Sequence, residues 1–562
     1  MTSVRPPGAR GVDSSGGRDP GVAQRSRREI NTVRFKKLAA VAGAVVIGAG
    51  VLAACGGSSS DSGMVTVNGS EPEVGLVTTN TNENGGGRIV DRLFTGLYYY
   101  DADGNPQPGM VDTLQTTDNK NYTITIKKGW KFTDGTEVKA HNFVDAWNFG
   151  AYTPNAQRQQ SFFAPIEGYD AVAAEKPTAK TMSGLKVVND YTFTVALKNP
   201  AIDFKLGLGF TPFKPLPDVA FKDIKAFGEN PVGNGPYKLQ SWQHNVQATL
   251  VPNDQYPGAN KAKNKGLVFK FYLDFDSAYS DLQSGNLDFL DTIPVSALRT
   301  YKQDLGDRAI TKPTAQNQTV AIPETLQHFS GQEGILRRQA ISLAIDRKQI
   351  TDNIFAGSRN PARDFTARTL PGFNGNLPNE SNLDYNPTKA VQLWNQANAI
   401  SPWSGTFVLA SNYDGGHKEW VEATVNSIKN VLKIDAQPQA IATFSQLRQQ
   451  VNARTIKSAF RTGWQGDYPS MLEFLEPIFV TGAGSNDVDY SNAAFDAKLR
   501  EAEAAPSAEQ SYQLTGQAQS ILLNDLPVIP MWDYVANAGE GVGVNAPMTW
   551  SGLADFENIT KS

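Results

Sequence analysis

Apolar residues recur along the chain with two spacings, one typical of strands and the other of helices. Residues 122–126, YTITI, alternate apolar and polar positions and predict a half-buried strand. Residues 141–149, HNFVDAWNF, place Phe143, Ala146 and Trp147 on one face of a predicted helix. Strands and helices interleave irregularly and without an internal repeat. This mixture predicts α/β lobes rather than a helical bundle or a β-sandwich.

Further elements are predicted in the middle of the chain. Residues 267–275, LVFKFYLDF, indicate a strand, and residues 278–290 indicate a helix, a stop at Gly285 and a short strand. A long helical pattern at 335–355, ILRRQAISLAIDRKQITDNIF, opens a second region of the chain, in which KEWVEATVNSIKNVLK at 418–433 is also helical.

An uncharged apolar run at residues 38–54, LAAVAGAVVIGAGVLAA, follows a basic N-terminal segment. Its length is below the roughly 20 residues that a membrane-spanning helix needs, and the order of basic, apolar and small residues is typical of a secretory signal. The residues LAAC at its end resemble a bacterial lipobox, in which the cysteine is lipidated. We therefore expect residues 1–54 to be a lipoprotein signal peptide and Cys55 to be lipidated.

Two alternatives remain open at this terminus. Cys55 is the chain's only cysteine, and it could be an unmodified thiol. The basic segment is also long for such a signal, and translation from Val33 would leave a signal of ordinary length. In either case, a single cysteine excludes an intramolecular disulfide.

The charge and length of the chain after residue 54 limit which functions and domain numbers are possible. Residues 1–54 carry nine Lys and Arg against three acids, so that the rest of the 562-residue chain has a net charge near −10, against −4 for the whole. Such an acidic chain lacks the electrostatic signature of nucleic-acid binding. About 500 residues exceed what one core usually serves, so two or three lobes are expected. Residues 55–64 contain GGSSSDSG and predict a flexible tether.

Catalytic motifs are missing from the sequence. It has no Gly-x-Ser-x-Gly, no His-Glu-x-x-His and no phosphate-binding loop, and its four histidines lie far apart. Acidic pairs such as those in DFLD at 288–291 are more often solvated than catalytic. We expect no enzymatic activity, no cofactor and no metal site.

Six segments, in this order, resemble blocks of the peptide/nickel family of ABC-transporter solute-binding proteins: RLFTGLYYYDADGNPQPGMVDTL (92–114), GWKFTDGTEVKAHNFVDAW (129–147), NPVGNGPYKLQSW (230–242), LRRQAISLAIDRKQI (336–350), YNPTKAVQLWNQA (385–397) and DLPVIPMWDY (525–534). The oligopeptide-binding members are the most similar, through residues 174–197 and FRTGWQGDYPSMLEFL at 460–475. The chain departs from the family at Lys139 and Asn142, where a Thr and an Asp usually form a capping box, so a weaker helix start is expected.

The resemblance implies a fold class and domain boundaries. We expect an α/β, two-lobed periplasmic-binding-protein-like fold of type II, cluster C, whose lobes close on a ligand by hinge motion. Lobe I would comprise residues 65–97, 233–319 and 534–562. An extra subdomain of lobe I would span 98–232, and lobe II, the closing lobe, would span 320–533.

The segment RTGWQGD, residues 461–467, is the strongest candidate for a ligand-binding strand. As a strand it would place Arg461, Gly463, Gln465 and Asp467 on one face, with a cation and an anion roughly 20 Å apart at its two ends. An extended peptide could pair with this strand, with Asp467 holding its ammonium group and Arg461 its carboxylate. The alternative is a structural ion pair or two solvated charges.

Further site residues follow from the resemblance alone. It implies His417 as a carboxylate partner for longer peptides, and it implies backbone hydrogen bonds from the opposite wall. The additional residues expected at the site are Trp464, Gly466, Tyr468, Asn84, Gly85 and Gly86.

These expectations define a function and its partners. The chain is expected to be a monomeric, extracytoplasmic receptor, anchored by its N-terminal lipid alone on the outer face of the cytoplasmic membrane, that delivers oligopeptides to an ABC permease and its ATPase. Another family solute, such as nickel, haem, glutathione or an oligosaccharide, is the first alternative. A cell-wall lipoprotein with a scaffold or enzymatic role is the second.

The anchor can be tested by replacing one atom. Cys55→Ser removes the sulfur that would carry the lipid, so we expect the variant to be released or mislocalised while it remains folded. Partitioning of whole-cell protein into a detergent phase measures this directly. A variant that partitions as the wild type does would contradict the lipoprotein assignment.

Overall fold

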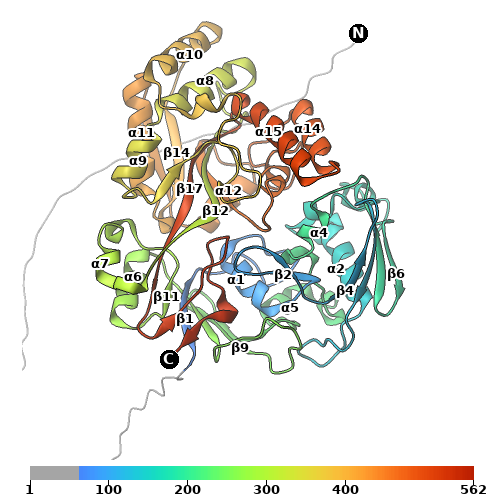
Figure 1. Cartoon of the computed structure of the whole chain (residues 1–562). Helices are drawn as coiled ribbons and strands as arrows, with labels where there is room; N and C mark the ends of the chain where they lie inside the picture. The colour runs from blue at the N-terminus through green and yellow to red at the C-terminus, as the bar shows by residue number, and fades with distance from the viewer. Residues whose placement is uncertain (1–62) are drawn as a thin grey trace, which may run out of the picture. The chain divides into compact units, whose positions relative to one another are not determined.

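Two 13-residue strands, β12 (Ala309–Ala321) and β17 (Val528–Glu540), form an antiparallel pair that runs through both lobes of the fold (Figure 1). The computed structural model describes residues 63–562. The signal peptide predicted for residues 1–54, Cys55 and most of the predicted tether lie outside the described residues. The register of the pair shifts between Pro313 and Asn317, so the irregularity separates the part beside lobe I from the part beside lobe II.

An 11-stranded sheet extends from this pair on both sides. On the lobe I side, β17 is followed in order by β11 (Phe289–Leu290), β1 (Val65–Gly69), β10 (Leu267–Phe271), β9 (Gln247–Pro252) and β8 (Tyr237–Gln243). On the lobe II side, β12 is followed by β16 (Ala459–Gln465), β14 (Phe407–Asn412) and β15 (Ala436–Ile441), while β13 (Arg359–Pro361) pairs with β17. The two lobes therefore share one sheet.

A separate four-stranded sheet lies in the region predicted as the extra subdomain. Its order is β4 (Val111–Gln115), β5 (Asn121–Ile126), β7 (Thr192–Ala196) and β6 (Leu185–Asn189). The helix predicted at 141–149 is α2 (Ala140–Ala151), and its apolar face is fully buried. Phe143 and Trp147 pack on Phe193 of β7, with ring centroids 5.7 and 5.6 Å apart. The α/β fold of two lobes with an extra subdomain is confirmed, whereas the exact boundaries stay predictions.

Helices cover the sheets of each part, as Figure 1 shows. Those of residues 63–305 are α1 (Asn84–Leu93), α2, α3 (Tyr169–Ala173), α4 (Phe204–Gly207), α5 (Ile224–Glu229), α6 (Phe275–Ser284) and α7 (Tyr301–Leu305). Those of lobe II are α8 (Gly331–Ala344), α9 (Arg347–Asn353), α10 (Pro387–Ile400), α11 (Lys418–Leu432), α12 (Phe444–Asn452), α13 (Glu476–Phe479), α14 (Ala493–Glu503) and α15 (Ala508–Asp525). Short strand pairs add β2 (Tyr98–Tyr100) to β3 (Pro106–Pro108) and β18 (Val544–Asn545) to β19 (Thr560–Lys561).

Two local predictions need correction. The helical pattern at 335–355 is broken into α8 and α9. α8 ends at Ala344, and the Asp346 side chain caps α9 by accepting the Gln349 N–H at 2.9 Å. The capping box expected to be missing from α2 is half present. The Asn142 side chain accepts the Lys139 N–H at 2.8 Å, and only the return bond is lost, since lysine offers no acceptor.

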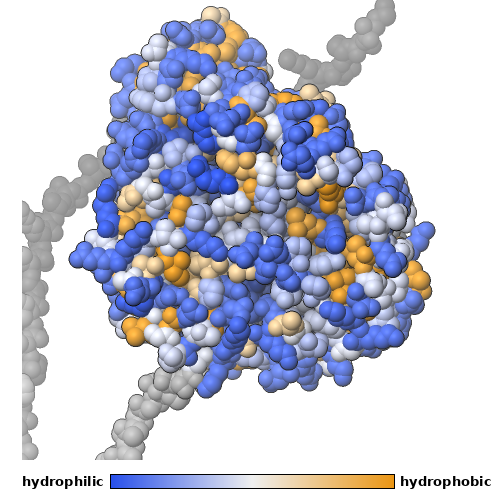
Figure 2. All heavy atoms as spheres, in the orientation of Figure 1, coloured by the Kyte–Doolittle hydropathy of each residue, from blue (hydrophilic) through white to orange (hydrophobic). Residues whose placement is uncertain are grey.

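The face shown in Figure 2 is largely hydrophilic among the described residues, and hydrophobic side chains form scattered patches on it. Between residues 63 and 562, no helix has the length and apolar character needed to cross a membrane.

Arg347 holds three segments of lobe II together from a buried position. Its guanidinium donates to the backbone oxygens of Pro530 and Leu383, both at 2.7 Å, and of Ser342 at 3.0 Å. The side chain is 3 % exposed, and burial lowers the pKa of the guanidinium to about 9. One cation thus satisfies carbonyl groups that water does not reach.

We expect Arg347→Met to destabilise lobe II by about 3 to 5 kcal/mol, because buried carbonyl groups lose charged donors. Differential scanning calorimetry should show the loss as a lower unfolding temperature. Lys348→Met is the matched control, since the neighbouring Lys348 side chain is 77 % exposed and pairs only with Asp352. Equal unfolding temperatures for the two variants would contradict this role of Arg347.

Candidate functional site

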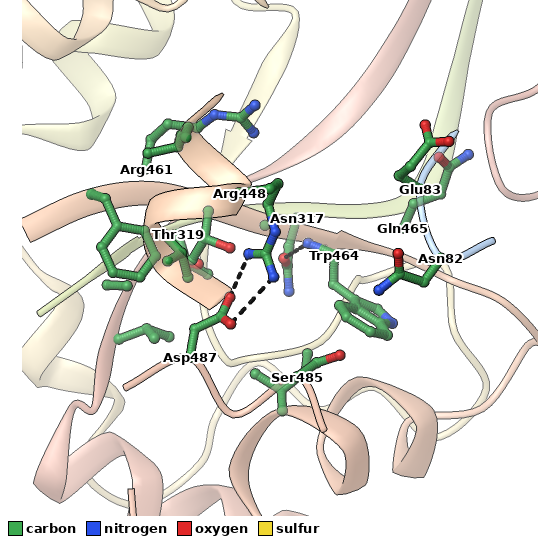
Figure 3. Close-up of a pocket in the computed structure, with 18 of the residues that line it drawn as sticks. Asn82, Glu83, Asn317, Thr319, Arg448, Arg461, Trp464, Gln465, Ser485 and Asp487 are labelled. Carbon is green, nitrogen blue, oxygen red and sulfur yellow. Dashed lines mark hydrogen bonds and ion pairs between the residues drawn. The ribbon is translucent and has the colours of Figure 1, made fainter. Parts of the chain in front are cut away.

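A cavity of about 210 Å³ lies between the lobes, with β16 along one wall (Figure 3). Lobe I contributes Glu73 and residues 82–84, β12 contributes Asn317, Thr319 and Ala321, and lobe II contributes the remaining lining, including residues 461–465 and Asp467. A second cavity of about 480 Å³ adjoins the first. The lining residues that both cavities share are Asn82, Glu83, Asn84, Trp464, Gln465, Asp467 and Ser485.

One edge of β16 is open where it lines the cavity. β12 pairs with β16 from Phe460 to Gln465, whereas β14 pairs with it only at Ala459 and Phe460. The backbone N–H groups of Trp464 and Gly466 face β12, where they donate to Asn317 Oδ1 and to the Ala315 oxygen. Since successive backbone groups alternate in direction, those of 461, 463 and 465 face the open edge.

Gly463 lets β16 lie close to β12 at this place. A Cβ atom there would lie 2.4 Å from the Asn317 backbone oxygen, which is shorter than any van der Waals contact. Gly463 is exposed and lines the cavity. The glycine therefore keeps the middle of the open edge free of a side chain, as the sequence predicts for an accessible backbone.

Arg461 places a cation at one end of the open edge. Its Nε donates to Asn412 Oδ1 at 2.7 Å, and its guanidinium lies 4.9 Å from the centre of the Phe444 ring. Among residues 63–562, no carboxylate lies within ion-pair distance of it, and burial lowers the pKa of the guanidinium to about 10. The group remains charged at neutral pH, with its terminal nitrogens available to an anion.

Asp467 places an acid at the other end, just beyond the last residue of β16. The strand prediction for 461–467 is thus two residues too long, because β16 ends at Gln465. Within the described part of the chain, the Asp467 carboxyl group meets Glu473 and no cation. Burial raises its pKa to about 8, and the negative charge of Asp91 adds to this shift. The edge therefore has a guanidinium group at one end and a carboxyl group at the other, and within residues 63–562 neither forms an ion pair. A ligand ammonium group beside Asp467 would favour the ionised carboxylate.

The wall opposite β16 is built around the start of α1. Glu83 caps this helix by accepting the N–H groups of Gly85 and Gly86 at 2.6 and 2.7 Å. Because Glu83 occupies both donors, the structure gives neither glycine a free N–H for a ligand, and neither lines the two cavities. Asn84 does line both. The donors of Gly85 and Gly86 are thus used within the chain, and a ligand contact from Asn84 stays a prediction.

The other predicted residues lie in different surroundings. The Trp464 side chain lines the cavity (Figure 3). Its indole N–H donates to Glu473. The Gln465 amide donates to the Ser551 backbone oxygen at 2.8 Å. Gly466 packs against the Trp550 ring, which a Cβ atom would approach to 2.7 Å. Tyr468 is buried beside Phe210, at the boundary with the extra subdomain.

His417 does not line the cavity that contains β16. It is 7 % exposed, and its Nδ1 accepts the Trp420 indole N–H at 3.1 Å. Burial and the nearby charge of Arg461 hold the pKa of its imidazole well below the usual value. A neutral, enclosed imidazole is not a charged partner for a carboxylate, so His417 is not carried into the site proposed below.

Sequence reasoning missed several lining residues. Arg448 of α12 projects into the middle of the cavity and forms an ion pair with Asp487 at 2.6 Å (Figure 3). Asn317 and Glu83 also line it, from β12 and the α1 cap. No motif marks these positions, because they meet only when distant segments pack together. In residues 63–562, no three His, Cys, Asp or Glu side chains are placed to hold a metal ion.

Known proteins share this fold and about a quarter of the aligned sequence. The oligopeptide-binding protein OppA of Bacillus subtilis (strain 168) is 27 % identical over 469 residues, which cover 81 % of this chain and 84 % of that protein. The structure of Haemophilus influenzae OppA in complex with RPPGFSPFR superposes with a TM-score of 0.80 at 23 % identity, covering 89 % and 99 % of the two chains.

A second solved structure gives the same result. The murein tripeptide binding protein MppA of Escherichia coli superposes with a TM-score of 0.80 at 20 % identity, covering 89 % of this chain and 98 % of that one. The model of bacterial extracellular solute-binding proteins, family 5 (middle), matches residues 105–486. The chain therefore belongs to family 5 of the bacterial extracellular solute-binding proteins.

Proposed function

We propose that this chain is an extracytoplasmic receptor that captures oligopeptides and delivers them to an ABC permease, whose ATPase supplies the energy for import. The observation that carries the proposal is the open edge of β16 between Arg461 and Asp467. An extended peptide has a cation at one end, an anion at the other and backbone hydrogen-bonding groups between them. Asp467 at one end suits the cation of the peptide, Arg461 at the other end suits its anion, and the backbone of β16 between them suits its hydrogen-bonding groups.

The peptide would pair with β16 as an added strand. Its backbone would bond to the groups of 461, 463 and 465, with its ammonium at Asp467 and its carboxylate at Arg461. Consecutive residues of a strand advance by about 3.3 Å, so six steps separate the two charged residues by roughly 20 Å. This span suits a peptide of about three to five residues once both side chains reach inward.

Contacts across the lobes support a closed, ligand-enclosing arrangement. The Ile202 N–H of the extra subdomain donates to the Glu503 backbone oxygen of lobe II at 2.9 Å, and the Ser470 hydroxyl donates to Asp203. The shared pair β12 and β17 is the place where two lobes on one sheet can rotate, since its register is irregular between Pro313 and Asn317. We infer that peptides enter an open form and are enclosed by this rotation.

Attachment to the membrane would come from Cys55. The basic and apolar segments before it and the LAAC sequence support a lipid anchor, and the flexible residues 55–64 would let the receptor reach a permease from that anchor. A single anchor leaves the receptor free to act as a monomer.

Charge also discriminates between oligopeptides and the alternative solutes. A free peptide uses both Arg461 and Asp467, whereas a metal cation would use only the acid and a neutral oligosaccharide would use neither. A buried charge that the ligand leaves unpaired is costly. The pair of opposite charges therefore favours a zwitterionic chain as the ligand.

The ammonium contact can be tested by Asp467→Asn, which keeps the shape of the side chain and removes its charge. Loss of one partner from a buried charge pair costs about 2 to 5 kcal/mol. We therefore expect affinity for free-amine peptides to fall by roughly 30-fold to several-thousand-fold, measured by isothermal titration calorimetry with a peptide mixture.

N-acetylated peptides provide the control for this variant. Acetylation already removes the ammonium charge, so these peptides should bind the wild type weakly, and Asp467→Asn should weaken them little further. The ammonium contact would be refuted by an Asn variant that binds free-amine peptides as tightly as the wild type.

A further inference from the structure

Glu473 is an acid enclosed directly behind the proposed ammonium site. It lies in the short 3-10 turn Leu472–Phe474, six residues after Asp467, and its side chain is fully buried, with 0 % exposure. One carboxyl oxygen accepts the Trp464 indole N–H. The other, Oε2, meets no N–H or O–H donor among the described residues. The carboxyl group of Glu473 lies within hydrogen-bonding reach of that of Asp467.

Within the described part of the chain, neither acid forms an ion pair with a Lys, Arg or His side chain. Apolar side chains of Met471 and Phe474 pack nearby. The charged and titratable groups that face the pair come from three elements: Asp91 of α1, Tyr100 of β2 and Tyr468 after β16. Asp91 is itself a carboxylate, already paired with Lys214 at 2.6 Å and bonded to Thr211. Two ionised acids side by side in such a place would repel each other.

A hydrogen bond between two carboxyl groups needs a proton on one of them. Burial raises the pKa of both acids. Asp467 lines both cavities, whereas Glu473 lines neither and is 0 % exposed, so ionisation costs more at Glu473. Glu473 is therefore the partner that keeps the proton. Its neighbours Trp464 and Asp467 both belong to lobe II, so the arrangement does not depend on closure of the lobes.

We propose that Glu473 is a positioning and specificity-determining residue that stays protonated and donates a hydrogen bond to the Asp467 carboxylate. This inference rests on the peptide-binding function proposed above. The two acids then present one negative charge, held in a fixed orientation, to the single positive charge of the peptide ammonium. When the cleft closes, the positive charge of the ammonium group is balanced by the single negative charge of the two acids. If both acids were ionised, one negative charge would stay unbalanced.

Glu473→Gln tests the protonation state, because a glutamine side chain is the neutral mimic of a protonated glutamate and keeps an N–H donor for Asp467. We expect its affinity for free-amine peptides at pH 7 to stay within about threefold of the wild type. A loss of tenfold or more in a folded variant would mean that Glu473 contributes an ionised charge, and it would overturn the proposal.

The pH profile gives a second readout that a merely structural role would not change. Burial raises the Asp467 pKa to about 8, and ammonium binding favours the ionised carboxylate, so affinity should rise as pH increases from 5 towards 8. It should fall again above roughly pH 8, where peptide amines lose their proton. Wild type and Glu473→Gln should follow the same curve, because Glu473 stays protonated throughout. A Gln variant with a flattened curve would contradict this.

Two further variants make the outcome unambiguous. Glu473→Leu removes the donor and the acceptor together, so we expect it to weaken peptide binding at least tenfold more than Glu473→Gln does. Glu476→Gln is the matched control, since Glu476 is an acid three residues along whose burial also raises its pKa, but it does not line either of the two cavities beside β16. Its affinity should equal that of the wild type.

The failure of this inference differs from the failure of the peptide-binding function. A wild type that binds no peptide overturns both. A different outcome overturns only the inference: the wild type binds peptides, Asp467→Asn weakens that binding, and Glu473→Gln weakens it as much. If Glu473→Gln fails to fold, the number of protons released by the wild type, measured calorimetrically in two buffers, decides. At pH 6, release of about one proton per peptide supports a single ionising acid, Asp467, whereas release of nearly none or of about two contradicts it.

Discussion

The site depends on the one-sided pairing of β16. β12 pairs with one edge of this strand from Phe460 to Gln465. β14 pairs with the other edge only as far as Phe460, so the rest of that edge has no strand partner among the described residues. A sheet edge with free backbone groups is normally a liability, since it invites pairing with any extended chain. Here the edge lies inside a cavity between two lobes, so that only a chain small enough to be enclosed can reach it. Binding that uses backbone groups in this way tolerates many side chains.

Charge then gives this edge a direction. Arg461 and Asp467 lie at opposite ends, and neither forms an ion pair in the described part of the chain. Elsewhere in the same cavity the fold pairs its charges, as with Arg448 and Asp487. Glu473 fits the same account, because a proton held there prevents the acidic end from carrying two charges. The fold thus leaves unpaired the two charges that a peptide can complete.

Local patterns in the sequence predicted much of the fold. The alternation in YTITI and the apolar face around Trp147 were sufficient for β5 and α2, since both elements pack by their own periodicity. The break at Asp346 depends on a side-chain cap, and the end of β16 at Gln465 depends on its strand partners. The spacing of apolar residues contains no information about either. For the site, Arg461 and Asp467 could be named from one segment. Glu83, Asn317 and Arg448 could not, because they come from three segments that only the tertiary fold brings together.

Native mass spectrometry of residues 56–562, purified without denaturation and then incubated with a mixture of short peptides, tests the central claim most directly. The account predicts a bound population whose added masses fragment into free-ended peptides of a few residues, and it predicts that Asp467→Asn loses this population while remaining folded. A wild type that stays at its unbound mass in the peptide mixture, or that retains a single non-peptide compound which the peptides do not displace, would contradict the account.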